Sequence, residues 1–443
     1  MKKIVFTSLG IAFFELINAQ TYQVSTVVGN GTQALVDGIG TNALCYAPYS
    51  VKSDGLNTIY FADTYNHSIR KYDINTHQVT TIAGNGVAGY QDGACTTAKF
   101  NYPEGVFYKN GFLYVGDNVN NVIRKINLTA NTVSTIAGSG VQGYLDGTST
   151  QAEFNQPKYL IVDNNNNVLV ADYENHCIRK ISTTGQVSTI AGVGGVSGFQ
   201  NGAGSTAKFY RPADLCMDAT GNIYVTDIMN NVVRKIDVNF NVSTFAGNGM
   251  AGNVDGLSAN AQFTHPTAID ITINNIFYVA DGTGGDNIRK IDALGNVTTI
   301  AGTFNSPGFL DGAPSVALFN QIQGLCFDPH GNLYVGDAYN NRIRKISVPE
   351  CSDCSAGISQ ISVLNSQIAV YPNPASGIVN IQVFNSSENS TYKLYNAIGQ
   401  ELKMGTITQG TNQINLQDLA SGIYTVVVLQ NDKISTSKIS LQK

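Results

Sequence analysis

The chain has 443 residues, with 45 glycines, 22 tyrosines, 19 phenylalanines and only 13% charged residues. This composition favours short strands and tight turns over helical bundles or a disordered acidic tail. A net charge of -5, an isoelectric point near 5.5 and the lack of a basic tract give no attraction for phosphate backbones, so we expect no nucleic-acid partner.

The chain begins with a segment typical of a secretory signal. Two lysines follow the initiator methionine, an apolar run extends from Ile4 to Leu16, and the small residue Ala19 precedes an expected cleavage site before Gln20. We therefore expect residues 1–19 to be removed after Sec export. No later segment has the roughly 18 consecutive apolar residues of a membrane-spanning helix, so we expect no transmembrane segment.

A repeat of 54 to 55 residues occupies most of the chain. It is marked by the tripeptide Ile/Val-Arg-Lys, whose arginines are Arg70, Arg124, Arg179, Arg234, Arg289 and Arg344. Each unit contains four short runs rich in Val, Ile and Tyr between Gly, Asn and Asp turns, which predicts a four-stranded antiparallel sheet. Such a sheet is apolar on both faces and needs neighbours on both sides. Six copies arranged radially therefore predict an all-β fold, a six-bladed β-propeller.

The two ends of the repeat array complement each other. The first residues after the signal, 24–29, read Val-Ser-Thr-Val-Val-Gly and match the Val-Ser-Thr-Ile-Ala-Gly that opens the units. Nothing of this type follows the last Ile-Arg-Lys-Ile at 343–346. We expect the N-terminal segment to pair as the outer strand of the last blade, because this closes the ring and removes an open sheet edge.

The repeat resembles a known family. Gly-Asn-x-Tyr-Val-x-Asp followed by Asn-x-x-Ile/Val-Arg-Lys-Ile, seen at 221–227 and 230–236 in the fourth unit, is similar to the NHL repeat. The resemblance covers roughly residues 22 to 347 and implies a six-bladed propeller used mostly for binding, with some relatives that are lyases. We expect the propeller to span residues 20–349.

An aspartate ends the Tyr-Val-x-Asp run of every unit. Its recurrence indicates a structural role, in which it accepts hydrogen bonds from the following turn and pairs with the arginine of the next strand. These residues are Asp63, Asp117, Asp172, Asp227 and Asp337. The fifth unit has a different turn, in which Asp281 or Asp286 is expected to take this role.

Positions that differ between the copies are the candidates for ligand contact. The residue after the Pro position begins each innermost strand and is expected at the mouth of the central channel, together with the variable turns. The candidate ligand-binding residues are Tyr49, Glu104, Lys158, Tyr159, Asp214, Thr267 and Gln323; the turns add Tyr65, Tyr173, Glu174, Met229 and Tyr339. A mixed polar and aromatic mouth suits a neutral polar ligand such as a glycan or peptide. A solvated channel without a ligand is the alternative.

The repeat stops before residues 350–361, a short polar stretch expected to be a linker. Alternating apolar strands follow and fit a small Ig-like β-sandwich. The motifs at 371–374 (Tyr-Pro-Asn-Pro), 395–400 (Tyr-Asn-Ala-Ile-Gly-Gln) and 420–424 (Ala-Ser-Gly-Ile-Tyr) resemble the type A sorting domain of Bacteroidetes type IX secretion. The resemblance implies that residues 362–443 form this domain, that the type IX machinery is a partner, and that the protein is secreted or displayed on the cell surface.

The seven cysteines and five histidines give little sign of metal chemistry. Cys351 and Cys354 have CxxC spacing in the linker, where a local disulfide is expected in an oxidising compartment and a metal site is the weaker alternative. Cys216 and Cys326 share one repeat position on apolar strands and are expected to be free, buried thiols. The histidines form no ligand set, so we expect no metal and no cofactor.

These features predict an exported binding or adhesion scaffold without catalytic activity. The alternative is a propeller lyase or lactone hydrolase that uses a metal in the channel. Glu104 and Asp214 are the only acids expected at the mouth, and two ligands are few for a tight metal site.

Overall fold

The computed structural model describes residues 23–347, 368–371, 377–383, 390–396, 401–408, 410–430 and 433–441. Contacts within the chain divide it into two units, Met1–Gln360 and Ile361–Lys443, and each is described by itself. The expected signal peptide and the expected Cys351–Cys354 disulfide lie outside the described residues. In the described part, no helix is long and apolar enough to cross a membrane.

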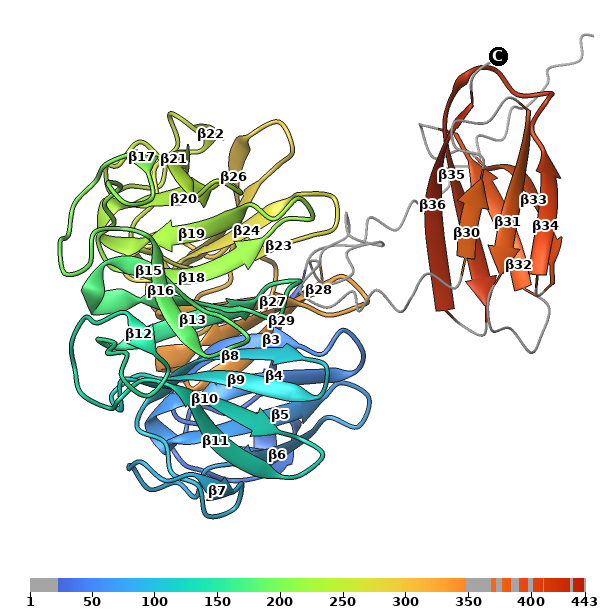
Figure 1. The fold of residues 1–443 in the computed structure, drawn as a ribbon. Coiled ribbons are helices and arrows are strands. Elements are labelled where there is room, and N and C mark those ends of the chain that lie inside the picture. Colours follow the sequence, from blue (N-terminus) through green and yellow to red (C-terminus); the bar gives the residue numbers. More distant parts are fainter. Residues whose placement is uncertain are drawn as a thin grey trace, which may run out of the picture. The chain divides into compact units, whose positions relative to one another are not determined.

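The first unit consists of six antiparallel sheets arranged as blades (Figure 1). The first blade has the order β2 (Gly38–Ile39), β6 (Gln78–Ala83), β5 (Ser68–Asp73), β4 (Thr58–Asp63), β3 (Pro48–Ser53). The second to fourth blades have equivalent strands in the same spatial order. Given in chain order, these strands are β7 (Gly93–Ala94), β8 (Pro103–Lys109), β9 (Phe112–Asp117), β10 (Val122–Asn127), β11 (Thr132–Ala137); β12 (Gly147–Thr148), β13 (Pro157–Val162), β14 (Val168–Asp172), β15 (Cys177–Ile181), β16 (Gln186–Ala191); and β17 (Gly202–Ala203), β18 (Pro212–Met217), β19 (Ile223–Asp227), β20 (Val232–Ile236), β21 (Asn241–Ala246).

The fifth blade has β22 (Gly256–Leu257), β23 (Pro266–Ile271), β24 (Phe277–Asp281), β25 (Asn287–Ile291) and β26 (Asn296–Ala301). The sixth has the order β1 (Val24–Val28), β29 (Arg342–Ser347), β28 (Asn332–Asp337), β27 (Ile322–Phe327). Short 3-10 turns are η1 (Gly40–Asn42), η2 (Thr64–Asn66), η3 (Tyr173–Asn175), η4 (Ile228–Asn230) and η5 (Ala338–Asn340). The all-β class and the six-bladed propeller are confirmed.

The innermost strands form a closed ring. β3, β8, β13, β18, β23 and β27 each contact the next, and β27 contacts β3; they gather around the centre of the propeller in Figure 1. Glycine permits the closest approaches, because a Cβ on Gly105 would lie 2.4 Å from the carbonyl oxygen of Lys158, and one on Gly324 would lie 2.2 Å from that of Tyr49. Apolar side chains fill the space between neighbouring blades, as where Tyr60 and Ile69 meet Phe100.

Five of the blades differ in one respect from the four strands expected. A fifth, two-residue strand lies at the outer edge, as where Gly38 pairs with Val79 and Ile39 with Gln78. These dipeptides follow the Asp or Asn that ends the Gly-rich loop. A pairing of two residues is too short to leave an alternating pattern, so the sequence does not reveal it.

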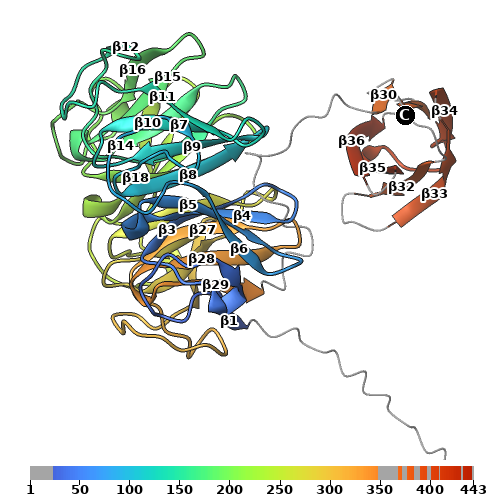
Figure 2. The same cartoon turned by 90° about the horizontal axis from the view of Figure 1, so that it is seen from below.

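The ring is closed by the N-terminal strand, as the sequence predicts. β1 lies beside β29 (Figure 2) and pairs antiparallel with it, with Val24 opposite Ile346 and Thr26 opposite Arg344. The sixth blade thus combines the beginning and the end of the repeat array. Its outer strand, β1, and the neighbouring strand β29 are about 300 residues apart in the sequence.

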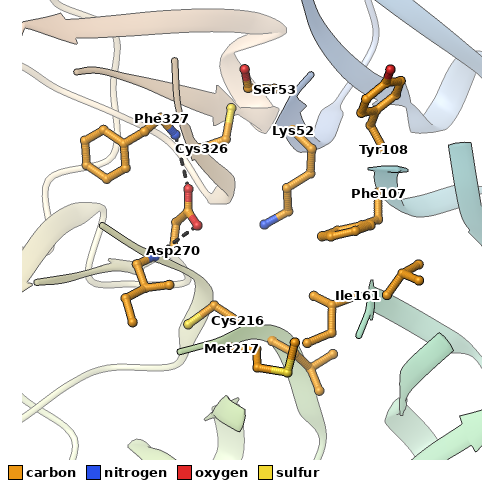
Figure 3. A pocket seen from close by; sticks show the side chains of 13 residues that line it. Lys52, Ser53, Phe107, Tyr108, Ile161, Cys216, Met217, Asp270, Cys326 and Phe327 are labelled. Carbon is orange, nitrogen blue, oxygen red and sulfur yellow. Dashed lines mark hydrogen bonds between the residues drawn. The ribbon is translucent and has the colours of Figure 1, made fainter. Parts of the chain in front are cut away.

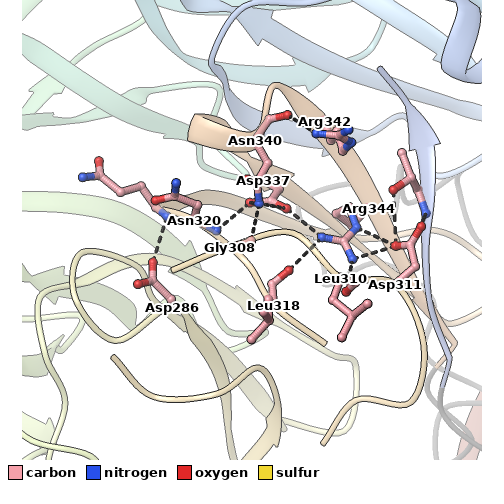
Figure 4. A network of polar contacts seen from close by, with 12 residues as sticks. Asp286, Gly308, Leu310, Asp311, Leu318, Asn320, Asp337, Asn340, Arg342 and Arg344 are labelled. Carbon is pink, nitrogen blue, oxygen red and sulfur yellow. Dashed lines mark hydrogen bonds and ion pairs between the residues drawn. The ribbon is translucent and has the colours of Figure 1, made fainter. Parts of the chain in front are cut away.

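Each blade contains a fully buried arginine. In the sixth blade, Nη1 of Arg344 donates to Asp337 at 2.8 Å and Nη2 donates to Asp311 at 2.6 Å, which joins the end of β28 to the Gly-rich loop (Figure 4). The rings of Phe309 and Phe319 lie 4.9 and 5.0 Å from the guanidinium carbon. Burial raises the pKa of Asp337 to about 6 against the opposing charge of Arg344. The equivalent pairs are Arg70–Asp63, Arg124–Asp117, Arg179–Asp172 and Arg234–Asp227, at 2.7 to 2.9 Å.

The fifth blade departs from this arrangement. Asp281 occupies the aspartate position, but its nearest contact with Arg289 is 3.6 Å, and its Oδ2 atom has no hydrogen-bond partner. The turn is one residue longer and lacks the asparagine that donates to the aspartate elsewhere, as Asn340 does to Asp337. Burial therefore raises the pKa of Asp281 to about 7.

The second unit contains two antiparallel sheets. One has the order β30 (Ile368–Tyr371), β31 (Ile378–Val383), β34 (Gly410–Asn415), and the other β33 (Glu401–Ile407), β32 (Ser390–Tyr395), β35 (Gly422–Gln430), β36 (Lys433–Leu441). Val379, Ile381 and Ile414 of the first sheet pack against Leu394 and Val426 of the second, so the unit is a β-sandwich. Apolar runs in the sequence predict β30, β31, β32, β34 and β35 but not β33 and β36, because lysines, serines and threonines interrupt the apolar pattern of these two strands.

Candidate ligand-binding face of the propeller

The inner strands begin at one end of the central channel. The turns after β4 and its equivalents lie at the same end. We call this end the mouth face. In the first blade the two features are brought together by the pairing of Pro48 with Asp63, and the same pairing places Pro157 opposite Asp172 in the third. The mouth face therefore carries the variable positions that the sequence singles out.

Side chains close the channel at the mouth. Nζ of Lys158 lies 3.4 Å from Oε2 of Glu104 in the neighbouring blade and 3.4 Å from Oε1 of Gln323 in the opposite blade. The same ammonium group lies 5.8 Å from the ring centre of Tyr49. Burial raises the pKa of Glu104, and the charge of Lys158 opposes that shift. These four candidates lie together and form a plug, in which Lys158 contacts the other three.

Three further candidates lie beneath the plug. Tyr159, Asp214 and Thr267 are each only 1% exposed. The hydroxyl of Tyr159 donates to the carbonyl of Gln323, and Thr267 Oγ1 donates to the carbonyl of Ile322 at 2.6 Å. Their polar atoms are bonded inside the channel, and direct contact of these three residues with a ligand stays a prediction.

Asp214 belongs to a buried ion pair across the channel. Its carboxylate lies 3.5 Å from Nζ of Lys52 and accepts backbone N–H groups of Leu215 at 2.9 Å and Ile269 at 3.1 Å. Lys52 is on the first blade and Asp214 on the fourth, which are opposite. Asp214 therefore differs from the residues at the same position in the other blades because it pairs with Lys52 on the opposite side of the channel axis.

A contiguous group of tyrosines surrounds one side of the plug. It comprises Tyr46, Tyr49, Tyr65, Tyr102 and Tyr339, and we call it the tyrosine platform. The ring of Tyr65 stacks on Tyr46 with centroids 4.9 Å apart and meets Tyr102 edge-on at 5.1 Å. The hydroxyl of Tyr65 interacts with those of Tyr49 and Tyr339. Tyr46 and Tyr102 were not among the sequence candidates, although their place just before each inner strand could have indicated them.

Two ion pairs continue the surface on the other side of the plug. Arg211 pairs with Glu174 at 2.8 Å, and Lys158 pairs with Glu104. Both cations lie near the ring of Tyr173, Lys158 at 4.9 Å and Arg211 at 5.4 Å from its centre. Each positive charge on this part of the mouth face is thus matched by a carboxylate.

A small cavity lies at the opposite end of the channel (Figure 3). Its volume is about 30 Å³, and Lys52, Phe107, Cys216, Asp270 and Cys326 are among the residues that line it. Such a volume holds about one water molecule. Cys216 and Cys326 are buried free thiols, as expected. Lys52 and Asp270 are not among the candidate residues predicted from the sequence, although a charge at the position that cysteine holds in two other blades could have indicated them.

Desolvation lowers the pKa of Lys52, but the carboxylates of Asp214 and Asp270 raise it more, so the ammonium stays charged. Asp270 accepts backbone N–H groups of Ile271 at 2.9 Å and Phe327 at 3.1 Å. Within the described residues, no three His, Cys, Asp or Glu side chains are grouped so that they could hold a metal ion.

The architecture and sequence repeats define the class of protein: a six-bladed propeller followed by a small β-sandwich. Residues 154–181 and 319–346 match the NHL repeat, and residues 369–442 match the secretion system C-terminal sorting domain. The chain thus carries NHL repeats and a sorting domain of type IX secretion, which directs it to the cell surface or the extracellular space.

Relatives share the repeats over part of their length. The chain is 28% identical to NHL repeat-containing protein 2 of Bos taurus, over 72% of this chain and 48% of that protein. It is 27% identical to Protein SUPPRESSOR OF QUENCHING 1, chloroplastic, of Arabidopsis thaliana, over 69% of this chain and 31% of that protein. The chain thus spans half or less of the length of these curated relatives.

Solved structures share the fold. A Bacteroides thetaiotaomicron protein of unknown function has a TM-score of 0.58 and 20% identity, covering 74% of this chain and 76% of that chain. An auxiliary nutrient binding protein from Bacteroides ovatus has a TM-score of 0.56 and 19% identity, with the same coverage. At these identities the similarity establishes the propeller fold.

Proposed function

We propose that the propeller is an exported binding or adhesion module without catalytic activity, which holds a polar ligand, a glycan or a peptide, on its mouth face. The observation that carries this proposal is the tyrosine platform, where five aromatic side chains from three adjacent blades gather beside a closed channel. Exposed aromatic groups with a polar end are typical of binding surfaces. The name of the Bacteroides ovatus relative, an auxiliary nutrient binding protein, is in keeping with this role.

The ligand rests on the plug and does not enter the channel. Glu104, Lys158 and Tyr49 form the floor of the proposed site, with Gln323 beneath Lys158. Tyr159, Asp214 and Thr267 hold the inner strands together from below, so their contribution to binding is indirect.

The alternative, a metal-dependent lyase or lactone hydrolase, receives no support from the mouth face. The acids of the mouth face are paired, Glu104 with Lys158 and Glu174 with Arg211, and Asp214 beneath the plug is paired with Lys52. A carboxylate held by a cation is a poor general base, and among the described residues no third ligand is grouped with these acids.

We propose the following organisation of the chain: a signal peptide over 1–19, the propeller over 20–349, a linker over 350–361 and the sorting domain over 362–443. The type IX secretion machinery is the partner of the sorting domain. A local disulfide between Cys351 and Cys354 remains a prediction for the linker.

Screening the full-length protein on an array of glycans and peptides tests the function. Calorimetric titration with any ligand found should show about ten-fold weaker binding for Lys158→Ala. Lys71→Ala, which removes an exposed lysine of β5, is the matched control and should bind like the parent protein. Equal affinity of the Lys158→Ala variant and the parent would place the site away from the mouth.

A further inference from the structure

The tyrosine platform offers few backbone donors to a ligand, because four of its five backbone N–H groups are already bonded. The N–H of Tyr46 donates to Asp63 at 2.7 Å, that of Tyr65 to the carbonyl of Tyr46 at 3.2 Å, and that of Tyr102 to Nδ1 of His67 at 3.2 Å. The N–H of Tyr339 donates to the carbonyl of Asn320 at 3.1 Å. Peptides that add a strand to a sheet edge are bound largely through main-chain hydrogen bonds, and the platform leaves few N–H groups for them.

The surface that remains combines ring faces with hydroxyl groups. Tyr65 and Tyr102 lie edge to face, and Tyr339 at the margin has 48% of its surface exposed. A pyranose ring presents C–H groups on its faces and hydroxyl groups around its edge. Tyrosine matches both, because its ring packs on an apolar face while its hydroxyl donates and accepts hydrogen bonds at the edge.

The charges next to the platform select against acidic ligands. Lys158 and Arg211 are each paired with a glutamate, at 3.4 and 2.8 Å, so neither offers an unbalanced positive charge. A paired carboxylate and cation can hold neighbouring hydroxyl groups of a neutral sugar. One hydroxyl donates a hydrogen bond to the carboxylate, and the next accepts one from the cation. The overall charge of -5 also opposes a polyanion.

Resting on the proposed binding function, we propose that the ligand class is a neutral polysaccharide, whose sugar rings stack on Tyr65 and Tyr339 and whose hydroxyl groups bond to the Lys158–Glu104 and Arg211–Glu174 pairs. Tyr173 links the two ion pairs and continues the aromatic surface past the plug. The residues come from the sixth, first, second, third and fourth blades, so the bound chain crosses the mouth face as an extended polymer.

Affinity electrophoresis and calorimetry with the full-length protein test this proposal. The probes are mixed-linkage β-glucan, arabinoxylan and α-mannan, with polygalacturonate as the acidic probe and a proline-rich peptide as the peptide probe. We expect at least one neutral polysaccharide to bind, and Tyr65→Ala and Tyr339→Ala each to weaken its binding ten-fold or more. Tyr65→Phe, which keeps the ring, should lose less. Tyr144→Ala is the matched control, because this tyrosine is similarly exposed, 41%, but lies in an outer loop of the third blade.

The outcomes separate the ligand class from the function. If only the peptide binds and its binding is lost in Tyr65→Ala, the saccharide class is wrong and the binding function stands. If polygalacturonate binds better than the neutral polymers, the class is likewise wrong. If a polysaccharide binds equally to the parent and to both alanine variants, the proposed site and the proposed function both fail.

Discussion

The Nδ1 atom of His176 accepts a hydrogen bond from the backbone N–H of Arg211, 3.3 Å away in the next blade. The same link joins every blade to its neighbour, and each accepting residue has a left-handed backbone conformation. The other five links are His67–Tyr102, Asn121–Gln156, Asn231–His265, Asp286–Gln321 and Asn341–Ala47, at 2.8 to 3.2 Å. Asp286 thus belongs to the ring of links, and Asp281 to the ring of arginine pairs.

The two histidine links are expected to weaken in acid. Burial lowers the pKa of both His67 and His176, so stability from these groups is present above their unfolded pKa near 6.5 and is lost as the pH falls through it. Protonated Nδ1 can no longer accept the N–H. The double variant His67→Asn with His176→Asn has at both positions the asparagine found in three other blades. Its melting temperature should therefore fall less than that of the parent between pH 7.5 and 5. Equal losses would contradict this role.

Asp281 should respond to pH in the opposite sense. Its folded pKa of about 7 lies above the unfolded value of 3.8, so its contribution to stability is fully present below pH 3.8 and is lost as the pH rises from there to about 7. Asp281→Asn should flatten the fall in melting temperature between pH 4 and 7. Asp172→Asn is the comparison, because Asp172 is bonded to Arg179 at 2.7 Å and to Asn175 at 2.8 Å, and it should cost more stability at pH 8 than Asp281→Asn does.

The cross-channel ion pair should stabilise the propeller more than it affects binding. Asp214→Ala removes the carboxylate nearest to the buried ammonium of Lys52 and leaves only that of Asp270 to balance its charge, which costs about 3 kcal/mol of unfolding free energy. The double variant Lys52→Met with Asp214→Ala should recover part of this loss. Urea unfolding monitored by circular dichroism measures both. A single variant as stable as the parent would show that the pair is not structural.

Removal of residues 20–29 should destabilise the propeller out of proportion to its length. Without β1, the strand β29 becomes an open edge with unpaired backbone groups. Differential scanning calorimetry should show a melting temperature several degrees lower, roughly 4 °C or more for a loss of 2 kcal/mol. A truncated protein that melts within a degree or two of the parent would contradict ring closure by this strand.

Deletion of residues 361–443 should leave a folded propeller in the periplasm. The two units have separate hydrophobic cores, and the second carries the sorting domain of type IX secretion. Fractionation of the native host, with circular dichroism of the retained protein, checks location and folding together. Arrival of the shortened protein at the cell surface would mean that export uses another signal.

Short-range periodicity in the sequence is enough to predict the blades, the ring closure and the arginine pairs. The blades repeat the same strands and turns, and in five of the six the aspartate and arginine of the pair lie seven residues apart on adjacent strands, as Asp63 and Arg70 do. The two-residue outer strands and β33 and β36 escape this reasoning, because they lack a run of alternating apolar residues.

The sequence by itself determined the repeat, the number of blades, the closing strand and the sorting domain, since each depends on residues close together in the chain or on a motif. Only the tertiary structure decided the character of the mouth. Lys158 meets Gln323 across 165 residues, and Lys52 meets Asp214 across 162. No local pattern shows that such residues share the channel axis, so variable positions that the sequence predicts as ligand contacts form a plug, and tyrosines that are mostly half-buried lie beside it.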